Sequence, residues 1–122
     1  MKLKRIYSNV IPFSGYLAVT AYPWVIIRKD IRQKYTPTID RHETTHGYQQ
    51  LECLWIIFFI WYFVEWLIKI PICFFANKNA YRSISFEQEA FYTQGKVDYN
   101  KNRKHYAWMK YIFKLYDKNG RV

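Results

Sequence analysis

The spacing of hydrophobic and polar residues divides the chain into an N-terminal part of β character and a longer helical part. The first part alternates loosely and is rich in residues that favour strands. Within it, residues 16–21 and 24–28 predict two strands that are joined near Tyr22-Pro23. We therefore expect a short β-hairpin over residues 1–30.

The hydrophobic pattern then changes to that of one long helix. No helix breaker occurs before Pro71, so we expect a helix over residues 40–70, with Thr38 or Asp40 as its N-cap. The first third of this helix is polar, whereas residues 53–64 are apolar on every face. A helix that is apolar on every face is buried, faces lipid or contacts another subunit.

Two shorter helices are predicted after Pro71. Ser85 and Gln88 have the spacing of a capping box, which predicts a helix over residues 85–95. A basic helix over residues 102–116 follows, with aromatic residues on one face and lysines on another. Together, the elements predict an α+β fold that is mainly α. In this fold the hairpin packs on the long helix, and the other helices return to it.

The composition favours a single domain over residues 1–122. A chain of 122 residues can bury a substantial core. An aromatic content of 21%, with only 4 Gly and 4 Pro, excludes intrinsic disorder and fibrous repeats. Cys53 and Cys73 lie in or beside apolar sequence, which indicates reduced core thiols rather than a disulfide framework.

The net charge favours an anionic partner. Lys and Arg number 19 against 9 acidic residues, which gives a formal net charge of +10 and attracts phosphate groups of lipid or nucleic acid. No helix-turn-helix, zinc-finger or RNA-binding signature accompanies this charge, so we rank nucleic acid last among the partners. The basic, aromatic C-terminal helix equally suits an anionic membrane surface. No secretory signal is evident, which predicts a cytoplasmic or peripheral membrane protein.

Residues 42–46 carry the strongest chemical signal. His42, Glu43 and His46 form an H-E-x-x-H motif. Residues four apart share one face of a helix, so both imidazoles can bind the same zinc ion. Glu43 then reaches the metal-bound water as the general base.

A zinc enzyme needs a third protein ligand. Glu52 lies about 15 Å further along the helix than His42, too far to supply it. The segment that opens the predicted helix 85–95 offers Glu87 and Glu89, both in its first turns, where the helix dipole favours carboxylates. Helix geometry alone leaves both candidates open.

The H-E-x-x-H motif followed by E-x-x-A resembles the gluzincin group of zinc peptidases. The likeness is strongest to the membrane-associated CAAX-processing type, whose third ligand begins an E-x-x-A-D motif. Residues 87–90 match the first four positions, so the resemblance implies Glu87 as the ligand, ahead of Glu89. Phe91 stands where that motif has Asp, which weakens the expected support for a histidine ligand.

A wider resemblance covers most of residues 11–93. The chain is similar to a family of short bacterial and bacteriophage proteins that carry four shared segments. In this chain the segments are residues 11–18, 42–52, 61–66 and 80–90. This resemblance implies a zinc metallopeptidase.

Together, the motif and the resemblance predict a zinc-dependent metallopeptidase. Zinc is expected on His42, His46 and Glu87, with Glu43 as the catalytic base and a peptide or protein as substrate. The alternative is a non-enzymatic interaction protein of a virion or a membrane that keeps a zincin-like fold. Either protein could form an oligomer.

Residues 53–76 are apolar enough to score as a transmembrane helix. A single span there would place the histidines and Glu87 on opposite sides of the bilayer, and the zinc site could not close. We therefore expect the helix to end near Lys69 without crossing a membrane and to pair Glu65 with Lys69. Its aromatic residues, within 53–68, would rest on lipid or on a protein partner.

Three further features allow a functional and a structural interpretation. Gln49 and Gln50 follow His46 closely, so one of them could contact the site. His105 could stabilise an oxyanion, although a surface histidine is the simpler interpretation. Residues 24–27 could form an edge strand that pairs with extended substrate, although a core strand is simpler.

Overall fold

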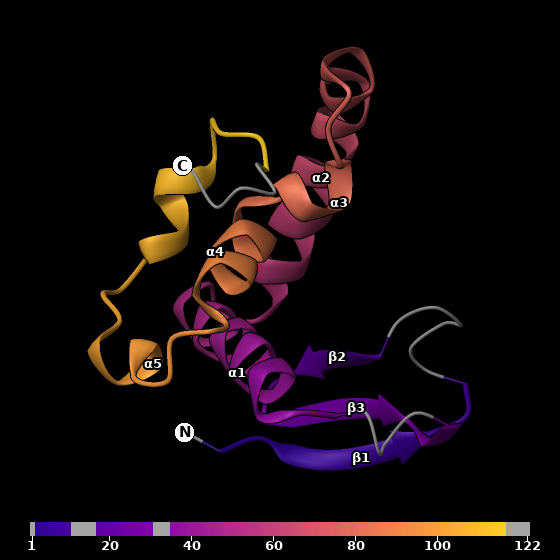
Figure 1. The fold of residues 1–122 in the computed structure, drawn as a ribbon, viewed down its shortest axis with the longest axis vertical. Helices are drawn as coiled ribbons and strands as arrows, with labels where there is room; N and C mark the ends of the chain where they lie inside the picture. The colour runs from indigo at the N-terminus through magenta and orange to yellow at the C-terminus, as the bar shows by residue number, and fades with distance from the viewer. Residues whose placement is uncertain (1, 11–16, 31–34, 117–122) are drawn as a thin grey trace.

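The computed structural model describes residues 2–10, 17–30 and 35–116 of the chain. Its fold is α+β and mainly helical, as predicted, with a small N-terminal sheet followed by helices (Figure 1). The elements in chain order are β1 (Lys4–Ser8), β2 (Ala18–Ala21), β3 (Trp24–Arg28), α1 (Pro37–Glu52), α2 (Ile56–Ala76), α3 (Ala80–Ser83), α4 (Ser85–Thr93), α5 (Tyr99–Asn102) and the 3-10 helix η2 (Ala107–Tyr111).

The sheet contains the predicted hairpin and one more strand. β2 and β3 pair antiparallel from Ala18 opposite Ile27 to Ala21 opposite Trp24. β1 adds on the other side of β3 in parallel, so the strand order is β1-β3-β2. β3 is therefore the central strand, and the suggestion that residues 24–27 form a substrate-binding edge is wrong. Pro12, Ser14 and Gly15 predict a turn before the hairpin, but these residues lie outside the described part of the chain.

Helix α1 begins earlier than predicted. Its N-cap is Thr36, whose hydroxyl oxygen accepts a hydrogen bond from the backbone N–H of Ile39, and Pro37 occupies the first helical position. Proline suits that position because its fixed φ matches the helix and no intrahelical donor is lost there. The predicted N-caps, Thr38 and Asp40, both lie inside α1. Asp40 instead accepts a hydrogen bond from the hydroxyl of Tyr35.

The predicted single helix over residues 40–70 is in fact two helices. α1 ends at Glu52, and Leu54 and Trp55 both have positive φ before α2 begins at Ile56. The backbone N–H of Trp55 donates to the carbonyl of Gln50, which closes the turn. Neither residue is Gly, so no local signal in the sequence marks this break. Pro71 does not end α2, which continues to Ala76.

The C-terminal half also differs from the prediction. Ser85 is the first residue of α4 rather than its N-cap, and it donates hydrogen bonds to Glu65 from both its backbone N–H and its hydroxyl. In place of one helix over residues 102–116, the chain forms α5 and η2, separated near Tyr106, where φ is positive. η2 packs on α4 and contributes Trp108 to the core. The other buried members of this core are Cys53, Phe58, Ile84 and Phe86.

Candidate metal centre

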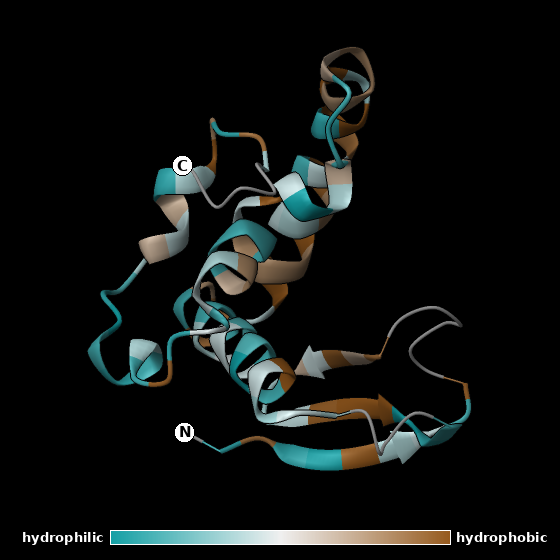
Figure 2. Ribbon diagram, in the orientation of Figure 1, coloured by the Kyte–Doolittle hydropathy of each residue, from teal (hydrophilic) through white to brown (hydrophobic). Residues whose placement is uncertain are grey.

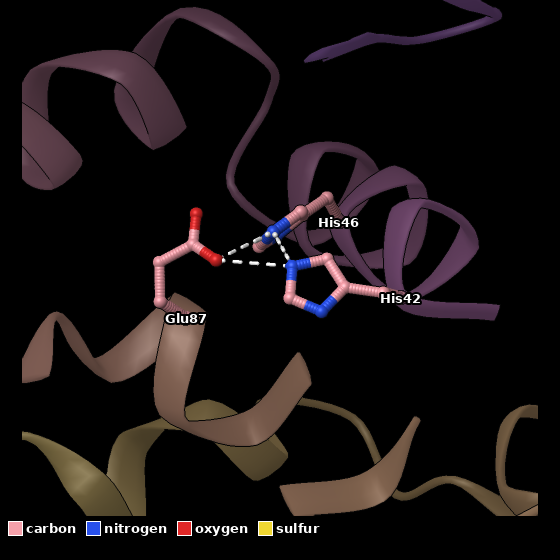
Figure 3. A group of neighbouring side chains, drawn as sticks. All are labelled: His42, His46 and Glu87. Carbon is pink, nitrogen blue, oxygen red and sulfur yellow. Dashed lines mark hydrogen bonds and ion pairs between the residues drawn. The ribbon is translucent and has the colours of Figure 1, made fainter. Parts of the chain in front are cut away.

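Three side chains converge from α1 and α4 (Figure 3). The Nε2 atoms of His42 and His46 lie 3.1 Å and 3.2 Å from Oε1 of Glu87, and 3.2 Å from each other. The two histidines project from successive turns of α1, and Glu87 lies in the first turn of α4. The two helices pack directly against each other, which holds the carboxylate opposite both rings. All three residues are buried.

The spacing of these three atoms fits a tetrahedral metal ion. Zinc ligands at about 2.0–2.1 Å in tetrahedral geometry are separated from one another by roughly 3.3 Å. The three observed separations, 3.1 to 3.2 Å, are close to this value. Two imidazole nitrogens and one carboxylate oxygen are also a donor set that zinc accepts in catalytic sites. The residues present therefore fit a zinc ion with one further coordination position.

Without a metal, the same three groups form a buried ion pair. Burial opposes charge on His46, but the adjacent Glu87 carboxylate outweighs it and raises the pKa of His46 to about 9. Burial likewise opposes charge on Glu87, yet the His46 charge and hydrogen bonds from both rings hold the pKa of its carboxyl well below the usual range. Glu87 is therefore ionised, and its carboxylate can bind a cation.

Each histidine is oriented by a glutamine. Nδ1 of His42 donates to Oε1 of Gln94 at 2.9 Å, and Nδ1 of His46 donates to Oε1 of Gln49 at 2.8 Å. An amide oxygen can only accept, so both Nδ1 atoms carry hydrogen. The Nε2 atoms are then the nitrogens that can bind a metal ion.

Gln49, which orients His46, also contacts a buried cluster of charged residues. The Gln49 amide nitrogen donates to Glu89, which also accepts hydrogen bonds from Tyr99 and Arg103. Arg103 in turn pairs with Glu52 at 2.8 Å. The structure thus brings Glu87 to the histidines and places Glu89 and Glu52 behind them.

Glu43 lies beside the three candidate ligands and is held separately. Its Oε1 accepts a hydrogen bond of 2.7 Å from the hydroxyl of Thr20 on β2. Burial raises the pKa of the Glu43 carboxyl, and the charges of His46 and His42 oppose this rise only in part. A carboxylate with a raised pKa is better able to take up a proton near neutral pH.

A cavity of about 580 Å³ gives access to these groups. Glu43, His46 and Glu87 line it together with residues of β2 and with aromatic side chains of α2. The hydroxyl of Tyr62 on α2 donates a 2.7 Å hydrogen bond to Oε2 of Glu87, which leaves Oε1 to face the histidines. The polar site therefore lies against a largely apolar cavity.

Several residues at the site were not found by sequence reasoning. Gln94, Tyr62 and Thr20 each contact a motif residue, and only Gln94 had a signal, since it lies seven residues and about two turns beyond Glu87. Phe91, at the Asp position of the E-x-x-A-D motif, packs its ring edge-to-face on His42. Gln94 instead supplies the hydrogen-bond acceptor for His42.

The remaining candidate residues are Gln50, which lines the cavity, and His105. Gln50 hydrogen-bonds to the backbone of Thr20 and Tyr22, which ties α1 to the β2–β3 turn. The His105 side chain is 90% exposed and lies beside Glu52, so it belongs to the surface.

We expect Gln94→Ala to weaken zinc binding about 10–100-fold while the protein stays folded, because His42 loses the acceptor that orients its ring. Competition titration with a chelator measures the affinity. Asn102→Ala, at the exposed C-terminal end of α5, is the control and should bind as the unmodified protein does. Equal affinity in Gln94→Ala would remove Gln94 from the support of the site.

Comparisons of the chain with known protein families, with curated proteins and with solved structures find no match. By length and composition, α2 could cross a membrane, and 22% of its most apolar stretch is buried inside the protein.

Proposed function

We propose that this protein is a zinc-dependent metallopeptidase with zinc held by His42, His46 and Glu87. The observation that carries the proposal is the triangle of ligand atoms, with sides of 3.1 to 3.2 Å, at the edge of a cavity that Glu43 also lines. An H-E-x-x-H helix that presents two ligands and an unligated glutamate is the arrangement used for metal-assisted hydrolysis.

The residues divide the reaction between them. Bound zinc would polarise the scissile carbonyl and lower the pKa of a water molecule. Glu43, oriented by the Thr20 hydroxyl, takes the proton of the attacking water and returns it to the leaving amine. Tyr62 holds Glu87 in place through its second carboxylate oxygen. The aromatic cavity wall excludes bulk water and can accept apolar side chains of a peptide.

A second candidate function is supported by the surface of α2. Exposed apolar side chains follow this helix along its length, as expected of a protein that binds a membrane or another protein. In this proposal the metal site is structural and the protein catalyses no reaction. Hydrolysis of a peptide by the purified protein, lost on removal of the metal, separates the two candidates.

Metal analysis of the purified protein tests the site. We expect about one zinc ion per chain, and we expect each of His42→Ala, His46→Ala and Glu87→Gln to lose it. The matched control is His105→Ala, which removes an exposed histidine outside the site and should keep the zinc. Full zinc retention in all three site variants would rule out this ligand set.

A further inference from the structure

Helix α2 presents an unusual surface, which we call the α2 face and define as the exposed residues between 54 and 76. Every exposed residue in that range is apolar. Phe74 and Phe75 are 79% and 86% exposed, and Ile56 and Ile60 are 62% and 59% exposed. The largely brown and tan colouring of α2 contrasts with the largely teal and white colouring of α1 in Figure 2.

The opposite side of α2 packs on the rest of the protein and makes hydrogen bonds with it. The buried positions of α2 are Phe58, Glu65, Lys69 and Cys73, which form one stripe along the helix. The ammonium of Lys69 donates to Glu65 and to backbone carbonyls of Ser83 and Lys114, and Glu65 accepts from Ser85. These contacts lie in the middle of α2. A bilayer that surrounded this helix would have to enclose α3, α4 and η2 as well.

The composition of the α2 face favours lipid over a protein partner. Even the more apolar protein interfaces, such as those of homodimers, are only about 65% apolar, because partners present polar groups at their rims. The α2 face has no exposed polar side chain over a helix of 21 residues. Hydrocarbon can cover such a surface without leaving any polar group unpaired.

The charges near α2 favour an anionic lipid surface. Lys78 and Arg82 are exposed just beyond its C-terminal end. Among the described residues from 53 to 116, Asp98 is the single exposed acid, because the glutamates there are buried. Basic residues that flank an apolar helix add electrostatic attraction to anionic headgroups.

We propose that α2 lies in the plane of an anionic lipid bilayer, with the α2 face in the acyl-chain boundary and the rest of the protein above it. The helix enters one leaflet and does not span the membrane. Phe59, Phe63 and Trp66 belong both to the α2 face and to the cavity wall, so the docked protein has its cavity beside the lipid surface. The docking itself does not depend on a bound metal.

Vesicle binding tests the proposal. Purified protein is mixed with phosphatidylglycerol–phosphatidylcholine vesicles or with phosphatidylcholine vesicles, and the bound fraction is measured by flotation. We expect binding at least about tenfold stronger to the anionic vesicles. Ile60→Glu/Phe74→Glu places two carboxylates on the α2 face, away from the cavity, and should weaken binding about tenfold or more. Val10→Glu/Val97→Glu, at two equally exposed apolar positions elsewhere, should keep at least half of the binding.

Depth measurements separate docking from spanning. Three of the five tryptophans, Trp55, Trp61 and Trp66, lie at α2, and we expect lipids brominated near the headgroup to quench the fluorescence of the protein more than lipids brominated near the chain end. Deep quenching would overturn the in-plane arrangement. Failure to float, or equal floating of the two double variants, would overturn docking through the α2 face. A stable dimer that vesicles do not dissociate would assign this face to a second copy of the chain. Glu87→Gln should float as the unmodified protein does, so loss of the zinc site leaves this test intact.

Discussion

Glu43→Gln is expected to lower peptide hydrolysis about 10²–10⁴-fold and to leave zinc content unchanged. The amide has the shape of the carboxylate, and its oxygen can still accept the hydrogen bond that Thr20 donates to Glu43. It cannot take up the proton of the attacking water. Glu43 is not one of the three candidate ligands, which are His42, His46 and Glu87. Its replacement therefore leaves the ligand atoms in place.

The measurement is turnover of a peptide mixture, read by mass spectrometry beside metal analysis of the same samples. Thr20→Val is the comparison, since it removes the group that orients Glu43 and keeps the base, and it should cost less than Glu43→Gln. Unchanged turnover in Glu43→Gln would exclude this residue as the base. If the unmodified protein cleaves none of the peptides, the non-enzymatic candidate is favoured.

The sequence predicted which residues share one face of a helix. It did not predict which residues from distant segments contact them. The positions of His42 and His46 on one helical face follow from a separation of four residues, and the structure places both rings toward Glu87. The choice of Glu87 over Glu89 came from a resemblance, because both residues open the same short helix. Only the packing of α1 on α4 shows that Glu87 faces the histidines while Glu89 pairs with Arg103.

The break between α1 and α2 was missed for a physical reason. Leu54 and Trp55 adopt positive φ, which costs L-residues energy and has no sequence signature. The turn is stabilised by tertiary contacts: Cys53 and Phe58, on either side of it, both belong to the buried core. It also allows Tyr62 to reach Glu87. β1 was missed because its residues are mainly exposed and show no alternation of apolar and polar positions.

The pairing of Glu65 with Lys69 was predicted from their i, i+4 spacing and is confirmed at 2.7 Å. The spacing did not predict that the pair is buried and fixes the N-terminus of α4. Glu65 accepts from the backbone N–H of Ser85 at 2.7 Å, and Lys69 donates to the carbonyl of Lys114 at 3.2 Å. One ion pair therefore joins α2 to the helix that carries Glu87 and to the segment after η2.

Lys69→Met is accordingly expected to lower the free energy of unfolding by about 3–5 kcal/mol. Methionine matches the volume of lysine but supplies no charge, so the Glu65 carboxylate stays buried without its partner. The carbonyls of Ser83 and Lys114 lose a donor as well. Urea denaturation followed by circular dichroism measures the change.

Lys78→Met is the matched control for this variant. It removes an exposed lysine just after α2 and should change stability by no more than about 0.5 kcal/mol. Glu65→Gln/Lys69→Met should be less destabilised than the sum of the two single variants, because the double variant leaves no unpaired buried charge. A loss below about 1 kcal/mol in Lys69→Met, or strict additivity in the cycle, would mean that the pair does not anchor α4. In that case the position of Glu87 depends on the packing of α4 against α1, α3 and η2.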